Sequence, residues 1–319
     1  MRLNKIYETV LAKGIEKDPR GKKAVLKERD KRKKIYKAMN KGEKEFFDLE
    51  SLTNPYADTR ILNGNGDEEI KSALVGIDME MAEILLADRL SSKGRKIDLV
   101  MSHHPEGRAY ANIYEVMHMQ ADILNKAGVP VNVAEELLEG RIKEVERRLS
   151  PANHARAVDF ARLLNIPFLC VHTPADNMVA SYLKSIFDKK RPDTLEDLLR
   201  ILRGIPEYKD AAKNSTGPKI LLGTKDRSAG KVFVDMTGGT EGAKGIFESL
   251  VNSGINTIVG MHLSEEHRKE AEKQHLNVVI AGHISSDNLG MNLMLDEIQK
   301  KGRLEVLPCS GFRRFSRIK

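Results

Sequence analysis

The sequence predicts an α/β protein, built of two α/β domains whose mixed sheets are covered by helices. From residue 71 onward, short apolar runs alternate with segments in which apolar residues recur at helical spacing. The composition, 40% hydrophobic and 31% charged, is that of a globular chain with an ordinary core, which excludes a disordered or fibrous protein. A cluster of turn-forming residues within 209–219 is the clearest linker-like break in this alternation.

The expected elements follow in chain order. Aliphatic and β-branched runs predict strands at 71–78, 98–102, 129–134, 167–171, 219–223, 231–236, 255–260, 277–282 and 303–308. Helical periodicity predicts helices at 79–92, 113–127, 135–149, 151–165, 177–189, 194–204, 242–253, 264–275 and 286–300. Ser150 and Pro151 form an N-cap and first-turn pair that separates two of these helices.

The net charge of +7 is concentrated at the N-terminus. Residues 1–44 carry 16 basic and 6 acidic side chains, a net +10, which leaves −3 for the other 275 residues. The dense part, Lys22 to Lys44, fits a solvated helix or an oligomer contact. It also fits a cationic arm at residues 17–44 for nucleic acid or another polyanion, although only Tyr36 among the lysines could stack on a base.

The sequence carries no sign of export or of a membrane span. The first ten residues hold charges where a signal peptide would be apolar, and no window approaches 18 uncharged apolar residues, so we expect a cytoplasmic protein with no membrane contact. The two cysteines, Cys170 and Cys309, exclude a disulfide framework and a four-cysteine zinc site. A metal site would therefore have to use histidines and carboxylates.

Three predicted strands end in histidine. His103 and His104 follow the strand at 98–102, His172 and Asp176 follow the strand at 167–171, and His283 and Asp287 follow the strand at 277–282. The three segments are DLVMSHHP, PFLCVHTPAD and NVVIAGHISSD. Because ligands gather at the carboxyl ends of strands in α/β sheets, we expect these groups to meet at one sheet edge.

The chemistry of these groups suits divalent transition metals. Imidazoles and carboxylates are ligands of Zn, Mn, Fe or Co, and this many of them fit two ions better than one. The alternative is structural: a single strand-end histidine is more often hydrogen-bonded, and Asp176 and Asp287 could simply favour the first turns of their helices. Recurrence at three strand ends favours the metal interpretation.

A glycine-rich turn, Met236 to Gly245, follows another predicted strand. The backbone N–H groups of Gly238, Gly239 and Gly242 could bind an anion at a helix N-terminus, or the glycines could only form a tight turn. The spacing matches neither the dinucleotide-binding nor the P-loop pattern.

These motifs, in this order, resemble the NIF-three-like dinuclear-metal family, also described as GTP cyclohydrolase one type two homologs. ADTRILNG (57–64), SALVGID with DLVMSHHP, VHTPAD, VFVDMTGGTEG and NVVIAGHISSD are similar to successive family units, and they cover residues 50 to 300. Two departures stand out. Asp287 replaces the family's last glutamate, and Val259, Gly260 and Met261 replace a Thr-Gly-Glu unit, with His262 and His267 out of register.

The resemblance implies metal ligation by His103, His104, Asp176, His283 and Asp287. It also implies a pair of α/β domains, toroidal homohexamers with the metal sites facing inward, and metal-dependent hydrolysis, GTP ring opening being claimed for some members. His172, as a positioning group, and Glu106 are the candidates for proton handling.

These expectations combine into three regions and two functions. We expect a basic helical segment at 1–50, a metal-binding α/β domain at 51–190 plus 277–319, and a second α/β domain at 191–276. The leading hypothesis is a hydrolase that uses a metal-activated water on a nucleotide- or phosphate-type substrate. The alternative is a non-catalytic metal-binding protein, regulatory or in contact with nucleic acid through its basic segment.

Overall fold

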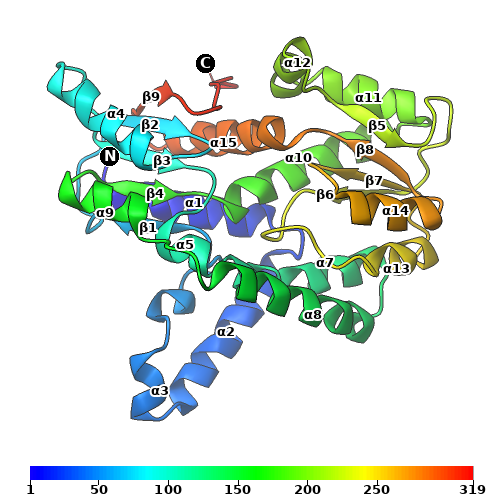
Figure 1. The fold of residues 1–319 in the computed structure, drawn as a ribbon, viewed down its shortest axis with the longest axis horizontal. Coiled ribbons are helices and arrows are strands. Elements are labelled where there is room, and N and C mark those ends of the chain that lie inside the picture. The colour runs from blue at the N-terminus through cyan, green and yellow to red at the C-terminus, as the bar shows by residue number, and fades with distance from the viewer. Residues whose placement is uncertain (319) are drawn as a thin grey trace.

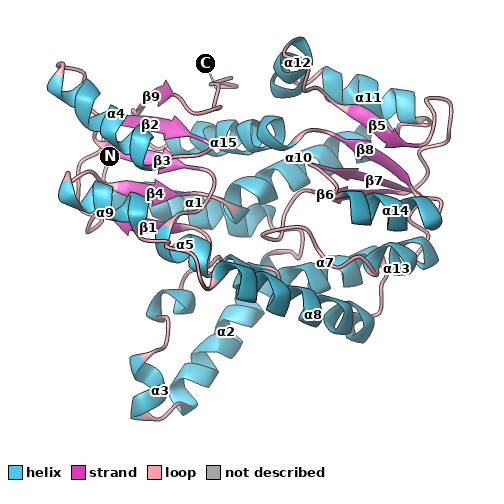
Figure 2. Cartoon of the chain, viewed as in Figure 1, coloured by secondary structure: helices cyan, strands magenta, loops and turns pink. Residues whose placement is uncertain are grey.

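The computed structural model describes residues 1–318, which form two mixed sheets with helices on both faces of each (Figures 1 and 2). This architecture confirms the predicted α/β class. The first sheet has the strand order β1-β4-β3-β2-β9 and the second has the order β5-β8-β7-β6. The strands are β1 (Arg60–Asn63), β2 (Ser72–Gly76), β3 (Leu99–Ser102), β4 (Phe168–Cys170), β5 (Lys219–Leu222), β6 (Val232–Asp235), β7 (Thr257–Gly260), β8 (Asn277–Ile280) and β9 (Glu305–Pro308).

The helices connect and cover these strands. They are α1 (Leu3–Lys17), α2 (Lys22–Ala38), α3 (Lys41–Glu45), the 3-10 helix η1 (Leu49–Leu52), α4 (Met81–Ser92), α5 (Gly107–Ala111), α6 (Ile113–Val116), α7 (Met119–Ala127), α8 (Val131–Leu149), α9 (Arg156–Leu163), α10 (Thr173–Lys190), α11 (Leu195–Arg203), α12 (Pro206–Lys213), α13 (Ile246–Asn252), α14 (Glu265–Lys273) and α15 (His283–Gln299).

The first sheet is parallel except for β1, which runs antiparallel to β4. Its two faces are buried by different helices, as the alternation of side chains along β2 shows. Ala73 and Val75 pack into a core with α1, α10 and α15, whereas Leu74 packs with α4 and α9 on the other face. Burial on both faces explains why these strands appear in the sequence as unbroken apolar runs.

The second sheet repeats this arrangement, with β5 antiparallel to β8 and the other pairs parallel. Val259 of β7 and Val279 of β8 pack against α10 and α11, and Ile258 and Val278 pack on the opposite face. That opposite face is covered by α6, α7, α8, α13 and α14. Residues 113–149 therefore pack on the second sheet, although we expected them in the first domain.

The boundary expected at residue 277 is also wrong. β8 pairs with β7 and β5, so residues 277–280 lie in the second sheet. α10 and α15 pack against each other and contribute side chains to the cores of both sheets: Ala175 and Met291 to the first, Val179 and Leu289 to the second. These two helices join the halves of the molecule, as Figure 1 shows.

The N-terminal segment is not one appendage. Leu3, Ile6 and Val10 of α1 are buried in the core of the first sheet. α2 and α3 instead project away from the body (Figure 1). Val25 is the fully buried apolar residue of α2.

Some local predictions fail for identifiable reasons. The apolar run at 129–134 is mostly the start of α8, because Val133, Ala134 and Leu137 continue at helical spacing into its buried face. The segment at 209–219 begins inside α12, and only the residues after Lys213 form a turn. β1 was not expected, because its single exposed-edge pairing leaves its sequence without a continuous apolar run.

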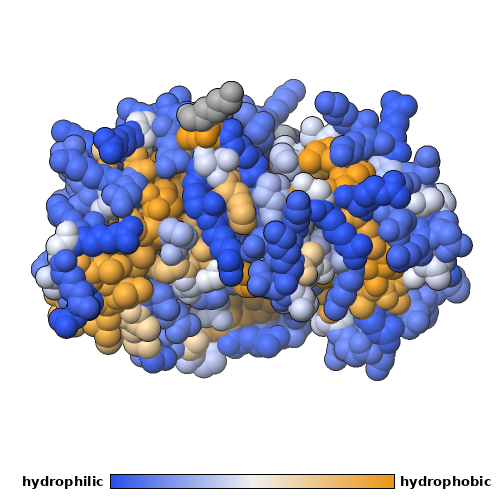
Figure 3. Space-filling view, turned by 90° about the horizontal axis from the view of Figure 1, so that it is seen from above, coloured by the Kyte–Doolittle hydropathy of each residue, from blue (hydrophilic) through white to orange (hydrophobic). Residues whose placement is uncertain are grey.

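The surface agrees with the charged composition. The face shown in Figure 3 is largely hydrophilic, with apolar side chains exposed between the polar ones. Within residues 1–318, no helix combines the length and the apolar character that crossing a membrane requires.

Candidate metal centre

The strand-end histidines and carboxylates converge, but from two sheets rather than one. His103 and His104 directly follow β3, and Asp176 lies in the first turn of α10, after β4. His283 is the first residue of α15, which follows β8 of the second sheet, and Asp287 lies one turn further along that helix. The prediction of a single sheet edge is therefore wrong, because the carboxyl ends of strands from both sheets face each other here.

One group of ligand atoms is formed by His103, Asp176 and Asp287. Nε2 of His103 lies 3.3 Å from Oδ1 of Asp176 and 3.4 Å from Oδ1 of Asp287. All three residues are buried, and their ligand atoms lie within 4.8 Å of one another. This group could hold a metal ion.

A second group is formed by His104, His283 and, again, Asp287. The other carboxylate oxygen of Asp287, Oδ2, lies 3.4 Å from Nε2 of His104 and 3.7 Å from Nε2 of His283. This group meets the same 4.8 Å criterion and is more open, since His283 is exposed. Asp287 is thus common to both groups and offers one oxygen to each.

The donor atoms fit a metal better than they fit each other. Both ring nitrogens of His103, Oδ1 of Asp176 and Oδ2 of Asp287 are buried without a hydrogen-bond partner within residues 1–318. Two ligand atoms on a tetrahedral ion with bonds of about 2.1 Å lie about 3.4 Å apart. The separations of 3.3–3.7 Å match that value. Buried polar atoms rarely lack partners, so these orphaned atoms point to a bound cation.

The electrostatics of the site lead to the same demand for positive charge. Burial alone lowers the pKa of His103, but the charges of Asp287 and Asp176 raise it well above its ordinary value. Burial likewise lowers the pKa of His104, but the neighbouring carboxylates of Asp287 and Asp78 raise it to about 9. Burial raises the pKa of Asp287, yet the imidazolium groups around it hold that pKa far below the ordinary value. Without a metal, these raised pKa values favour protons on the two imidazoles.

Two further carboxylates fix the orientation of imidazoles. Oδ1 of Asp78 lies 2.6 Å from Nδ1 of His104, which directs Nε2 of that ring toward Asp287. Oδ2 of Asp58 lies 2.7 Å from Nδ1 of His172 and also accepts a hydrogen bond from the Thr173 hydroxyl at 2.6 Å. Such contacts set the tautomer and the direction of a histidine ring.

His172 lies beside the first group. Its Nε2 is 3.8 Å from Oδ2 of Asp176, and its ring centroid is 5.0 Å from that of His103. Glu106 lines the same cleft. Burial, followed by the carboxylates of Glu80 and Asp78, raises the pKa of Glu106 to about 7. Both groups are therefore placed where they could exchange protons with a molecule in the cleft.

A cleft of about 500 Å³ opens onto the two groups. The first sheet contributes residues that follow its strands, such as Asp78 and His104, and the second sheet contributes Asp235, Thr237 and His262. Most of the lining side chains are polar, and several are acidic. The cleft is large enough for a small-molecule ligand and would bring it directly against the metal-binding groups.

The glycine-rich turn borders this cleft in a way that differs from the prediction. α13 begins only at Ile246, so Gly238, Gly239 and Gly242 do not lie at its N-terminus. A Cβ at Gly238 or Gly242 would lie 2.7 Å from the side chain of Gln120, whose amide nitrogen donates to the Gly238 carbonyl at 2.6 Å. Packing on α7 thus explains two of the glycines without an anion.

Three residues of the site were not predicted as site residues. Asp58 and Asp78 lie inside the segments that carry the family resemblance, but a single aspartate in a loop has no local signal of its function. His262 is out of register with the family unit, yet its ring centroid lies 5.0 Å from that of His283. A histidine directly after an apolar run, here β7, is the signal that could have identified it.

The chain is similar to proteins of the NIF3 superfamily. The structure of a NIF3 superfamily protein from Sphaerobacter thermophilus superimposes with a TM-score of 0.71 at 29% sequence identity, over 80% of this chain and 91% of that chain. No protein-family model and no curated protein matched the chain.

Two other solved structures align over most of the chain at lower similarity. Reduced HcgD from Methanocaldococcus jannaschii is 15% identical, with a TM-score of 0.49 over 78% of this chain and 87% of that chain. The hypothetical protein SA1388 from Staphylococcus aureus is 14% identical, with a TM-score of 0.44 over 82% of this chain and 93% of that chain.

Proposed function

We propose that this NIF3-like protein binds two divalent metal ions and uses them to hydrolyse a nucleotide- or phosphate-type substrate in the cleft between its sheets. The observation that carries the proposal is the position of Asp287, whose two carboxylate oxygens each face a separate set of unpaired ligand atoms. A carboxylate shared in this way is typical of two-metal sites.

The residues of the two groups are suited to Zn, Mn, Fe or Co, since they offer only imidazole nitrogens and carboxylate oxygens. When bound, two such ions supply Lewis acidity, which activates water and stabilises negative charge on an attacked oxygen. His103, Asp176 and Asp287 hold one side of the centre, and His104 and His283 hold the more open side. The substrate is expected to approach from that open side.

Proton handling falls to His172 and Glu106. Oδ2 of Asp58 lies 2.7 Å from Nδ1 of His172 and orients that ring, with Nε2 at the edge of the centre. Glu106 has a pKa of about 7 and can both donate and accept near neutral pH.

The metal part is tested by elemental analysis of protein purified without chelators. Wild type is expected to carry two ions per chain, His103→Ala and His283→Ala one each, and Asp287→Ala fewer than one. His118→Ala, which changes an exposed histidine of the chain outside the cleft, is the matched control and should keep both ions. Less than one ion per chain in wild type, with no further loss in His103→Ala, would exclude the two-metal centre.

The hydrolase part is tested separately with metal-loaded protein. We expect turnover of at least one compound in a panel of nucleotides, phosphoesters and ring amides, and loss of that turnover in Asp287→Ala. If no compound in the panel is hydrolysed, the enzyme assignment fails even if both ions are bound.

A second candidate function is a non-catalytic metal-binding protein that docks on nucleic acid. The observation in its favour is the row of exposed lysines on α2, a helix that projects away from the body in Figure 1. DNA binding by protein that shows two bound ions and no turnover would favour this candidate over the hydrolase.

The resemblance further leads us to propose a toroidal homohexamer with its metal centres facing inward. Light scattering coupled to size exclusion measures the mass directly. A mass other than six times 35.8 kDa would exclude that assembly.

A further inference from the structure

The arm, defined as residues 22–46, separates its charges by direction. It carries 11 basic and 4 acidic side chains. Glu28 points back toward the body and holds two arginines: Nη1 of Arg20 at 2.5 Å and Nη2 of Arg32 at 3.0 Å. Asp30, the other acidic residue of α2, lies 3.9 Å from Lys33. Glu28 and Arg32 of α2 are thus paired within the protein.

The remaining lysines form a stripe on the outward side. Lys23, Lys27, Lys31, Lys34 and Lys37 are all exposed, and none has an acidic partner within 4.0 Å among residues 1–318. Their spacing of four, four, three and three residues keeps them on one face of an α-helix, over about 21 Å. Like charges at this spacing destabilise a helix, so an isolated protein gains nothing from the arrangement.

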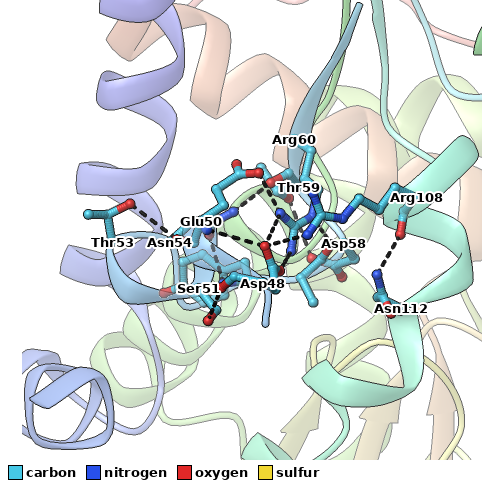
Figure 4. A network of polar contacts seen from close by, with 12 residues as sticks. Asp48, Glu50, Ser51, Thr53, Asn54, Asp58, Thr59, Arg60, Arg108 and Asn112 are labelled. Carbon is cyan, nitrogen blue, oxygen red and sulfur yellow. Dashed lines mark hydrogen bonds and ion pairs between the residues drawn. The ribbon is translucent and has the colours of Figure 1, made fainter. Parts of the chain in front are cut away.

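The arm is held rigidly at both limbs. In the outgoing limb, the segment just before α2, the buried Arg20 donates two hydrogen bonds to Asp18, each 3.0 Å long. Asp18 also accepts a hydrogen bond from the Tyr56 hydroxyl at 2.9 Å. In the returning limb, the segment just after α3, Asp48 and Glu50 both contact the buried guanidinium of Arg60, as Figure 4 shows. Because of these contacts, the stripe is presented in a fixed orientation away from the body.

These observations point to one class of partner. We propose that α2 docks on the phosphate backbone of double-stranded DNA, without sequence preference, through Lys23, Lys27, Lys31, Lys34 and Lys37. Lysine binds phosphate as a point charge, and no arginine or amide side chain lies in the stripe to recognise bases. The inference rests on the second candidate function, of which it names the partner, and it does not depend on the proposed hydrolase.

The shape and composition of the arm favour duplex DNA over other polyanions. A protruding helix fits the major groove of B-DNA, about 12 Å wide, whereas the major groove of duplex RNA is deep and narrow. Single strands are usually bound by several exposed aromatic rings, whereas Tyr36 of α2 lies against Phe47, with ring centroids 4.8 Å apart, which leaves Phe46 as the exposed ring of the arm. An anionic membrane would require an apolar face, and the outward face of α2 is the lysine stripe itself.

The first measurement is the salt dependence of binding, with the full chain and a short fluorescent DNA duplex of arbitrary sequence. Five phosphate contacts predict a slope of about −4.5 in log K against log salt. Affinity should then fall about 500-fold between 50 and 200 mM salt. Duplexes of unrelated sequence should bind equally well.

The second measurement compares two triple variants of equal net charge. Lys27→Gln with Lys31→Gln and Lys34→Gln should reduce the slope to about −1.8, so that the same change in salt weakens binding only about 12-fold. The control is Lys190→Gln with Lys209→Gln and Lys213→Gln, three exposed lysines of the body, and should behave as wild type. Replacing the three stripe lysines with arginine should preserve binding, and circular dichroism and metal content should stay unchanged in all variants.

Several results would overturn the proposal. One is that wild type does not bind DNA at 50 mM salt. Another is that the stripe variant and the body control lose the same amount of DNA affinity. A third is that duplex RNA, poly-glutamate or anionic vesicles bind as tightly as duplex DNA or more tightly. The metal content of the same samples reports on the proposed metal centre, so the two proposals can fail independently.

Discussion

Asp287 lies between His103 and His104, with Oδ1 3.4 Å from Nε2 of the first ring and Oδ2 3.4 Å from Nε2 of the second. The Asp287 side chain is almost fully buried, and its pKa is held far below its ordinary value by these imidazoles. It is therefore ionised at any physiological pH. Protons on the two imidazoles and metal ions compete for the same carboxylate, which makes the centre sensitive to pH.

Metal-free protein should lose stability as the pH rises from about 6.5 to about 9. The pKa of His104 is about 9 in the folded state and 6.5 without its partners. Protonation of His104 therefore stabilises the folded state fully below pH 6.5, and this stabilisation is lost as the pH passes 9. The loss is about 3 kcal/mol at most. Urea unfolding of chelator-treated protein at both ends of this range measures it.

Metal-loaded protein should show the opposite trend, because ligand imidazoles must lose their protons before an ion binds. His104→Gln should flatten the profile of the metal-free protein. A wild-type profile that is flat between these pH values would contradict the assignment of a raised pKa to His104.

Asp78→Asn should weaken metal binding at the group that contains His104. Asp78 holds Nδ1 of that ring at 2.6 Å, and loss of such an orienting carboxylate typically weakens metal affinity about 10- to 100-fold. Competition with a chromophoric chelator measures the affinity of each ion. Asp67→Asn, at an exposed ion pair with Arg2, is the control, and an equal effect of both substitutions would refute an orienting function of Asp78.

The sequence is sufficient to predict the ligand atoms but not the sheets that bring them together. A histidine that follows an apolar run is visible locally, which is why His103, His172 and His283 were identified from sequence. Which strand pairs with which depends on contacts between distant residues. β8 was therefore recognised as a strand and still placed in the wrong domain, and the meeting of two sheet edges was not foreseen.

The orienting residues could not be predicted for a related reason. Asp58 contacts His172, which lies 114 residues further along the chain, and Asp78 contacts His104 across 26 residues. Neither aspartate is distinguished from the other acidic residues by its neighbours in sequence. The charge of the arm was visible in the sequence, but its separation into the ion pairs of Glu28 and an exposed lysine stripe required the structure.

Arg60→Met should destabilise the protein by about 3–5 kcal/mol, because it leaves the carboxylates of Asp48 and Glu50 without their buried cation (Figure 4). The loss should also loosen the returning limb of the arm. Denaturant unfolding gives the free energy, and limited proteolysis reports on the arm. Arg108→Met removes an exposed partner of the same Asp48 and should change stability by less than about 1 kcal/mol. Similar losses for the two variants would exclude a special contribution of Arg60.

Gly290→Ala should disturb the metal centre without touching a ligand. A Cβ at Gly290 of α15 would lie 2.7 Å from the carbonyl oxygen of Ala175 in α10, which is backbone and cannot rotate away. The added methyl group therefore forces apart the two helices that carry Asp287 and Asp176. We expect a loss of about 1–3 kcal/mol in unfolding free energy, together with weaker binding at the group that these two aspartates share with His103.

The matched control is Gly140→Ala in α8, where a Cβ meets no atom within 4 Å. That substitution should stabilise the protein by about 0.5–1 kcal/mol, since alanine is the better helix former. Denaturant unfolding and metal titration of both variants complete the test. If Gly290→Ala keeps wild-type stability and metal affinity, the separation of α10 and α15 does not determine the geometry of the centre.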